Sequence, residues 1–331
     1  MVEDALNFSR GKAAMTYRGA RPWESLVKSQ LSPKGSLKTW QTESRLDWEV
    51  EKAQAVFTPN GKEKPVEFPN RTVLYRTDND FPLGVVSNSH FKPVQPVEAL
   101  EFYVDLIRDY GYKLEWAGPM KGGQKIWAMA NIGKPFVIGK SGKNSDTLGS
   151  YLLFATGMDG STATTIRVMS VRDCCQNILG KQVGDKGISI SHRGKFDPVI
   201  AKEKLGILIK ETDSFTKIAN ELALKKFSDE QAKEFFETLL NVSAEAVEEK
   251  KEPKKNNKFE DLMLAYKKGP GAELASAKGT AWGAVNAVTY YVDHIVGRAV
   301  DTRLNKAWFG ANARLKTRAF ALAMKTAKVS V

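Results

Sequence analysis

The sequence predicts an α+β fold: an antiparallel β-meander sheet with one packed helix, followed by a helical C-terminal region. Two observations predict it. Up to about residue 196, short segments rich in apolar and β-branched residues are separated by turns that contain Gly, Pro, Asn or Asp, a pattern typical of antiparallel strands. From about residue 197 onward, apolar residues recur with the 3.6-residue period of helices. Strands and helices do not alternate regularly, which argues against a parallel doubly wound sheet.

Residues 1–45 mix glycine, serine, proline and isolated aromatic residues without a clear period. They predict an N-terminal arm with one short helix from Trp23 to Ser29. The domain expected next, residues 46–196, opens with three short strands at hairpin spacing. Those strands are expected at 48–57, 71–77 and 83–87.

One helix interrupts the predicted strands. Pro96 stands where a helix can begin, apolar residues follow at helical spacing, and Gly111 ends the pattern. Strands then resume, with glycine-bearing turns between them. They are expected at 112–117, 125–132, 135–138, 151–157 and 164–169.

The rest of the chain is predicted to be helical. Residues 197–243 contain one long helical pattern and a second that opens with the capping-box residues Ser228 and Gln231. Residues 244–258 are rich in Glu and Lys and predict a flexible linker, because such a composition cannot bury a core. A last helical region is expected over 259–331. Its helices are expected at about 258–268, 279–297 and 311–327.

Composition narrows the classes of protein. A hydrophobic content of 42% and a charged content of 27% are ordinary for a soluble globular chain of 331 residues. No window approaches the roughly 20 apolar residues of a membrane span, and the N-terminus carries acids where a signal peptide carries bases. We therefore expect a cytoplasmic protein. The formal net charge of +12 favours nucleic acid as a partner, and no concentrated basic amphipathic helix favours a membrane.

The basic charge is concentrated near the C-terminus. From Arg298 to Lys328 the chain carries eight basic residues and one acidic residue, Asp301. One interpretation is a solvated, lysine-rich helix face. The other is a footprint for a phosphate backbone, because clustered Lys and Arg gain free energy by releasing condensed counterions. Composition alone does not choose between them.

The helix expected at 279–297 carries a polar and aromatic seam on an otherwise apolar surface. The 3.6-residue period places most members of this seam on one stripe and the others one position round the helix. A seam of this kind needs a partner, which predicts an interface. Its residues are Trp282, Asn286, Thr289, Tyr290, Asp293 and His294.

No catalytic arrangement stands out in the sequence. The three histidines do not share a metal-ligand spacing with another His, Cys or carboxylate. The stretch 139–145 resembles a phosphate-binding loop but lacks the required glycine spacing. We therefore expect no catalytic residues, no metal and no cofactor. An unrecognised nuclease is an open alternative, and its only candidate magnesium ligands are Asp146, Asp159 and Asp173.

Several ordered blocks of the chain resemble a phage and plasmid protein family catalogued as domain of unknown function 932. The resemblance runs from about residue 20 to 325. It implies a chain encoded by a phage or plasmid, and the order of meander and helices is similar to that of the single-strand annealing proteins of recombination. The blocks that carry it include Leu46–Val50, Leu83–Val86, Phe91–Gln95, Asp159–Ser161 and Thr280–Thr289.

Two main hypotheses follow. The first is a protein that binds single-stranded DNA without sequence preference, as a possible homo-oligomeric ring or filament that assists strand annealing or recombination. The second is a protein-interaction module acting on a host nucleic-acid-processing factor through the seam. For the first hypothesis, aromatic and basic side chains would stack on bases and neutralise phosphates. The candidate contacts are Arg71, Arg76, Lys121, Lys125, Arg167, Arg172, Arg193, Arg314, Lys316 and Arg318.

Overall fold

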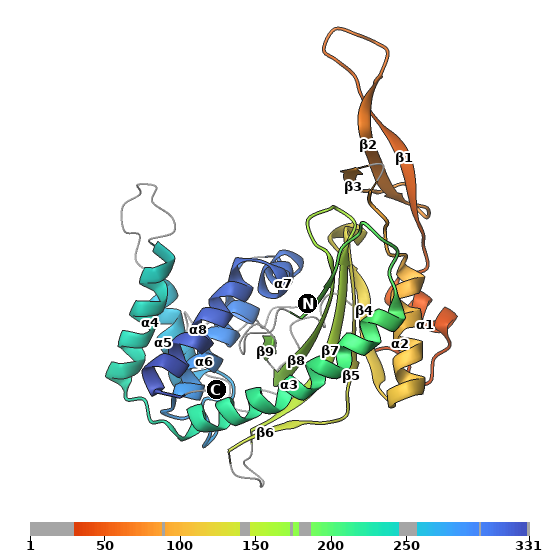
Figure 1. The fold of residues 1–331 in the computed structure, drawn as a ribbon. Helices are drawn as coiled ribbons and strands as arrows, with labels where there is room; N and C mark the ends of the chain where they lie inside the picture. Colours follow the sequence, from red (N-terminus) through yellow and green to blue (C-terminus); the bar gives the residue numbers. More distant parts are fainter. Residues whose placement is uncertain are drawn as a thin grey trace.

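The structure, a computed structural model, has two antiparallel sheets and a set of packed helices, the predicted α+β class. Figure 1 shows the larger sheet between helices α1 and α2 on one side and the C-terminal helices on the other. The smaller sheet projects from one end of the molecule. The structure describes residues 30–87, 90–139, 146–172, 175–178, 187–244, 257–297 and 299–329.

The smaller sheet is the predicted three-stranded meander. Its order is β1-β2-β3, and both pairs are antiparallel. The outer half of the β1–β2 hairpin is exposed apart from Ala55, whereas the part of the sheet near the body buries Val50, Leu74 and, on β3, Leu83. The strands are β1 (Val50–Phe57), β2 (Val66–Arg76) and β3 (Pro82–Ser87).

The larger sheet has seven strands. Its path is β10-β8-β7-β5-β4, with β6 added to β7 and β9 added to β8, and all pairs are antiparallel. The five predicted strands are confirmed, and β9 and β10 are additional. The strands are β4 (Lys113–Met120), β5 (Lys125–Asn131), β6 (Phe136–Ile138), β7 (Asp146–Gly157), β8 (Thr164–Arg172), β9 (Cys175–Ile178) and β10 (Ile188–Ile190).

Helix α2 (Pro96–Tyr110) covers one face of this sheet. A capping box joins the side chains and backbones of Gln95 and Glu98 at its start, and Gly111 ends it at a φ of 68°. The Tyr103 hydroxyl lies 2.9 Å from the carbonyl oxygen of Ala128 and 2.8 Å from that of Leu152. These bonds fix the helix on β5 and β7, as expected for a packed helix.

An arm without regular structure is predicted for the end of residues 1–45, and this is wrong, because residues 37–44 form a helix. Helix α1 (Leu37–Ser44) begins at Ser36, whose hydroxyl accepts a hydrogen bond from the Thr39 amide. Trp40 is buried, and its indole nitrogen donates to the Ser32 carbonyl oxygen over 2.8 Å. Burial of this indole holds the segment on the sheet domain. The helix predicted from Trp23 to Ser29 lies outside the described residues.

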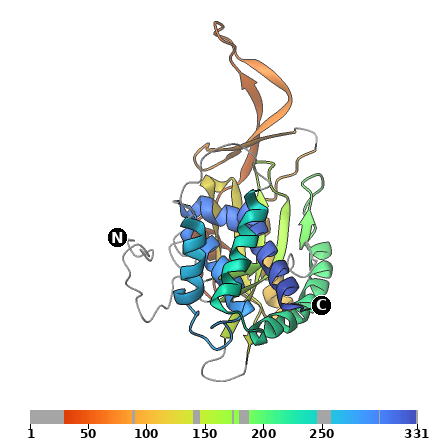
Figure 2. The same cartoon turned by 90° about the vertical axis from the view of Figure 1, so that its left-hand side faces the viewer.

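The C-terminal half is helical, as predicted, and Figure 2 shows its helices side by side. The capping box is confirmed: the Gln231 amide donates to the Ser228 hydroxyl, and the Ser228 amide donates to the Gln231 side chain. Helix α7 was not predicted, and residues 245–256 of the predicted linker lie outside the described residues. The helices are α3 (Pro198–Leu224), α4 (Asp229–Ala244), α5 (Asn257–Lys268), α6 (Ala281–Tyr290) with a π-helical turn (Tyr291–Ile295), α7 (Val300–Phe309) and α8 (Ala311–Ala327).

The sheet and the C-terminal helices share one hydrophobic core. At their contact, the rings of Trp127 on β5 and Trp308 on α7 meet edge to face with centroids 5.3 Å apart. This buried aromatic contact holds α7 against the sheet.

Among the described residues, no helix is both long and apolar enough to cross a bilayer.

Candidate nucleic-acid interface

Polar residues gather where one end of the seven-stranded sheet meets the smaller sheet. The β7–β8 turn is held by Asp159, whose Oδ1 atom accepts hydrogen bonds from the Ser161 amide and hydroxyl. A 3₁₀ turn (Lys121–Gly123) joins β4 to β5 beside it, and the Met158 amide donates to the Gln124 carbonyl oxygen over 2.7 Å. These two turns form the base of the candidate site.

Lys125 is a buried cation at this end of the sheet. Its Nζ atom donates to the Thr162 hydroxyl over 2.6 Å and lies 5.2 Å from the centre of the Phe309 ring. The pKa of Lys125 is lowered, chiefly because burial disfavours the ammonium form; Asp159 opposes this effect and Lys121 adds to it. An anion bound beside Lys125 would stabilise its charged form.

Arg167 lies on the same face of the sheet as Lys125. Through the register of β5, β7 and β8, residues 125, 127 and 167 project to one side, the side that faces α7. The Arg167 guanidinium donates to the Trp308 carbonyl oxygen over 3.1 Å. This carbonyl belongs to the last turn of α7, where helix carbonyls lack intrahelical partners and carry partial negative charge. Arg167 therefore ties the end of α7 to the sheet.

The contact of Arg76 with phosphate stays a prediction, and the structure shows partners for Arg76 within the chain. Its guanidinium forms two hydrogen bonds to the Asp78 carboxylate, donates to the Gly122 carbonyl oxygen over 3.0 Å, and lies 4.4 Å from the centre of the Trp48 ring. The hydrogen bond from Arg76 lowers the pKa of Asp78. Arg76 thus holds the 3₁₀ turn that carries Lys121, and three of its five N–H donors are used within the chain.

A hollow of about 630 Å³ adjoins the β7–β8 turn. Arg193 lines it and is exposed, and His192 stacks on Phe91 with ring centroids 4.4 Å apart. Arg71 is also exposed and pairs across the smaller sheet with Ser87, a residue of the hollow's wall. The predicted cation Arg193 therefore lines the depression, and Arg71 stands opposite one residue of its wall.

Helix α8 carries a cationic stripe. From 302 to 331 the chain contains seven basic residues and no acidic residue. Positions 314, 318 and 325 fall on one face of α8, Lys328 caps its end, and all four side chains but the half-buried Arg318 are exposed. Lys325 and Lys328 were not among the predicted contacts. Their spacing from Arg314 in the sequence is the signal that could have identified them. Gly310 joins α8 to α7, so the stripe follows along the chain directly after the helix that Arg167 contacts.

The prediction that Lys316 contacts nucleic acid is wrong. Its side chain is 2% exposed, and its Nζ atom donates over 2.9 Å to Oδ1 of Asp293, which is fully buried. Position 316 lies on the face of α8 opposite Arg314, and that face packs against α6. Local charge density alone gave no sign of this burial. The side chain of Arg172 lies outside the described residues.

The predicted seam has its partner inside the same chain. The Trp282 indole nitrogen donates over 2.9 Å to Oδ2 of Asp146, and Asp293 bonds Lys316. All residues of α6 are buried, and Tyr290 stacks on the half-buried His294. An external interface along the seam is therefore wrong, and the hypothesis of a protein-interaction module loses the surface on which it depended.

The structure does not bring together the candidate magnesium ligands of the nuclease alternative. Asp146 begins β7 and Asp159 follows its end, so roughly 40 Å of strand separate them at 3.3 Å per residue. Asp173 lies outside the described residues. Within the part of the chain that the structure describes, no three His, Cys, Asp or Glu side chains form a group able to hold a metal ion.

A family comparison covers most of this architecture. The model of a protein family described as a domain of unknown function (DUF932) matches residues 82–314, more than half of the chain. The chain belongs to this family. The DUF932 region begins at the first residue of β3 and ends within α8, so it contains the seven-stranded sheet, Lys125, Arg167 and Arg193. No curated protein and no solved structure matches the chain.

Proposed function

We propose that this DUF932 protein binds single-stranded DNA without sequence preference and assists strand annealing or recombination for a phage or plasmid in the host cytoplasm. One observation carries the binding proposal. Residues 302–331, which include most of α7 and all of α8 and carry no acidic residue, meet cations of the sheet through two contacts, Arg167 with Trp308 and Lys125 with Phe309. Basic side chains from distant parts of the sequence are thereby brought into one region.

The binding mode follows from the chemistry of these side chains. Exposed Arg71, Arg193 and Arg314 neutralise phosphates, and the release of condensed counterions supplies free energy that does not depend on base sequence. Phe309 is half-buried beside Lys125 and offers an aromatic surface for one base. Stacking of this kind contributes about 1–3 kcal/mol per base and accepts every base.

Fluorescence polarisation with a labelled oligothymidine tests the proposal. The double variant Arg193→Ala and Arg314→Ala should bind several-fold more weakly than the wild type, because two phosphate contacts are lost. Lys38→Ala is the matched control, since Lys38 is an exposed cation of α1 on the other side of the sheet. An equal loss in the control, or no wild-type binding at low salt, would remove the proposal.

A further inference from the structure

The hollow beside the β7–β8 turn is lined by hydrogen-bond donors and by no carboxylate. Three segments that are far apart in the sequence meet there: the end of β3 with the residues that follow it, the β7–β8 turn, and β10 with the residues that follow it. Their polar side chains supply four hydroxyl groups, two imidazoles and one guanidinium group. None of the described residues that line the hollow is acidic. This composition favours an anion over a cation as the ligand.

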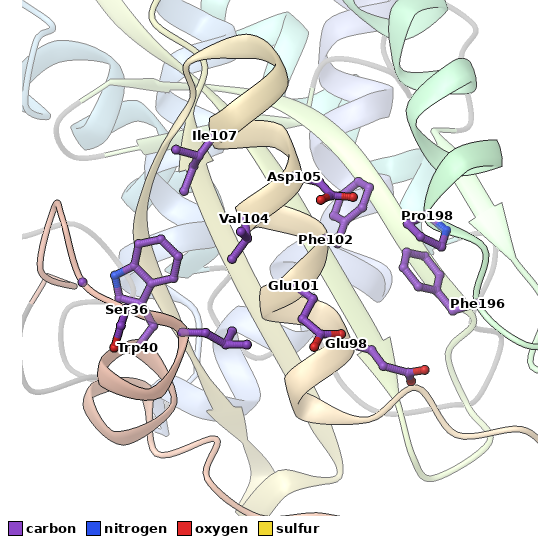
Figure 3. Close-up of a pocket in the computed structure, with 12 residues that line it drawn as sticks. Ser36, Trp40, Glu98, Glu101, Phe102, Val104, Asp105, Ile107, Phe196 and Pro198 are labelled. Atoms are coloured by element: carbon purple, nitrogen blue, oxygen red, sulfur yellow. The ribbon is translucent and has the colours of Figure 1, made fainter.

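A second hollow of similar size has the opposite character. It lies between α1 and α2, and its volume is about 660 Å³. Figure 3 shows carboxylates of α2 beside it, and none of the residues that line it is basic. These carboxylates belong to Glu98, Glu101 and Asp105. Because like charges repel, only the hollow at the β7–β8 turn suits an anion.

A buried cation without a counter-ion lies behind this hollow. Lys125 is 5% exposed, and its Nζ atom donates to the hydroxyl of Thr162, a residue of the hollow's wall. Among the described residues, no carboxylate forms an ion pair with Lys125. Asp159 only partly offsets the effect of burial on the pKa of Lys125, and its Oδ1 atom accepts from Ser161. A negative charge in the hollow would stabilise the buried ammonium group.

Two hydroxyl groups of the wall have protons to donate. A lysine ammonium group and a backbone amide can only donate hydrogen bonds. Lys125 donates to the Thr162 hydroxyl oxygen over 2.6 Å, and the Arg193 amide donates to the Ser191 hydroxyl oxygen over 3.3 Å. Each hydroxyl proton is therefore left for another acceptor. For Thr162, the Ser161 hydroxyl oxygen at 3.3 Å is a long contact, and a charged phosphate oxygen is a stronger acceptor.

The imidazole of His192 holds the wall in place. Its Nδ1 atom lies 3.0 Å from the Lys92 carbonyl oxygen, and its Nε2 atom lies 3.2 Å from the Thr162 carbonyl oxygen. The same ring is buried and stacks on Phe91. These contacts join all three segments, so the donors are positioned before a ligand arrives, which lowers the cost of binding. The exposed side chain of Arg193 lies next to this fixed wall.

We infer that the hollow binds a phosphate monoester, carried either by a free nucleotide or by the end of a nucleic-acid strand. The Thr162 and Ser191 hydroxyls and the Arg193 guanidinium donate to its oxygens, and Lys125 supplies positive charge behind Thr162. A monoester has three terminal oxygens and about two negative charges at pH 7, which suits this set better than the single charge of an internal phosphodiester. The strand end rests on the proposed function, whereas the phosphate site itself is tested without DNA.

Calorimetric titration of the full chain with thymidine monophosphate tests the inference, with thymidine as the ligand that lacks phosphate. The wild type should bind the monophosphate and not thymidine. Ser191→Ala should weaken binding about tenfold, because one hydrogen bond to a charged group is lost. Ser161→Ala is the matched control, since this exposed hydroxyl donates to Asp159 and does not line the hollow. Circular dichroism verifies that each variant keeps its secondary structure.

Two further pairs of variants separate a built site from general surface charge. Arg193→Ala should weaken binding of the monophosphate, and Lys38→Ala, which removes an exposed cation of α1, should not. Thr162→Val should also weaken it, whereas Thr162→Ser keeps the hydroxyl and should bind as the wild type does. The serine variant decides the role of the hydroxyl if the valine variant fails to fold around Lys125.

Oligothymidine with and without a terminal phosphate distinguishes the two sources. If the strand end is the ligand, the terminal phosphate should tighten binding several-fold in the wild type and not in Ser191→Ala. If the free nucleotide is the ligand, the monophosphate binds and the terminal phosphate makes no difference.

Three results would overturn the phosphate site. They are a wild type that does not bind the monophosphate, equal binding of the monophosphate and thymidine, and equal losses in Ser191→Ala and Ser161→Ala. Oligothymidine without a terminal phosphate is measured in parallel, so a failure of this site is distinguished from a failure of DNA binding.

Discussion

Lys316 and Lys325 lie on the same helix in opposite environments. Lys316 is buried against Asp293, whereas Lys325 is exposed on the cationic stripe. Removing two charges from water is costly, and only their mutual attraction offsets that cost. The loss of one partner leaves the other charge buried and unpaired. The role of each cation in this chain is therefore set by its burial.

Lys316→Met tests the structural role of the buried pair. We expect the free energy of unfolding to fall by about 3–5 kcal/mol, because Asp293 is left as an uncompensated buried charge. Lys325→Met is the control on the same helix and should change stability by less than about 0.5 kcal/mol. Urea denaturation measures both. Equal effects of the two substitutions would show that the pair does not exist in solution.

Lys202 provides a pH-dependent contribution to stability. It donates to Asp105 over 2.8 Å, and this hydrogen bond is the main cause of the lowered pKa of Asp105. A carboxyl with a lowered pKa stabilises the folded state above its unfolded pKa of about 4, and this contribution is lost as the pH falls through the folded pKa.

We therefore expect Lys202→Met to reduce the free energy of unfolding near pH 7, by less than about 1 kcal/mol for a pair near the surface. The difference from the wild type should disappear in acid, once Asp105 is protonated. Lys204→Met, an exposed neighbour, should show no such dependence. Denaturation at a series of pH values measures it, and a difference that persists unchanged in acid would contradict this assignment.

Close backbone contact positions the smaller sheet on the candidate site. Gly84 of β3 lies against the β7–β8 turn, and a Cβ atom at this position would stand 2.6 Å from the Asp159 Cα atom. Backbone atoms cannot move aside as a flexible side chain can. The absence of a side chain at residue 84 therefore lets β3 reach the turn that bonds Lys125.

Gly84→Ala should lower the free energy of unfolding by about 1–3 kcal/mol, the usual cost of overpacking. Val85→Ala, at the adjacent exposed position, should have a smaller effect. Thermal or urea denaturation of the two variants gives the comparison. If Gly84→Ala proves as stable as the wild type, β3 does not press on this turn in solution.

At the scale of the whole molecule, local signals in the sequence predicted most elements. Pro96 and Gly111 bound α2 as expected, and Ser228 with Gln231 opens α4. Helix α1 was missed because its stability depends on the burial of its own residue Trp40 against parts of the fold that are distant in sequence. Tertiary packing of this kind leaves no short-range pattern.

The candidate site was harder to predict than the fold. Arg193, Arg71 and Arg314 are exposed as expected, but the partners of Lys316 and Arg76 could not be read from charge alone. Asp293 lies 23 residues from Lys316 in the sequence and reaches it only through the packing of α6 on α8. Which cations remain available to a partner is therefore a property of the folded chain.

The salt dependence of DNA binding tests the central claim most directly. For a series of sodium chloride concentrations, the logarithm of the association constant for oligothymidine is plotted against the logarithm of salt concentration. Wild-type binding should fall linearly, with a slope of about −0.7 per neutralised phosphate. The Arg193→Ala and Arg314→Ala double variant should give a shallower slope, and Lys38→Ala the wild-type slope. Binding that is insensitive to salt, or a slope unchanged in the double variant, would contradict the claim that these cations bind the phosphates of single-stranded DNA.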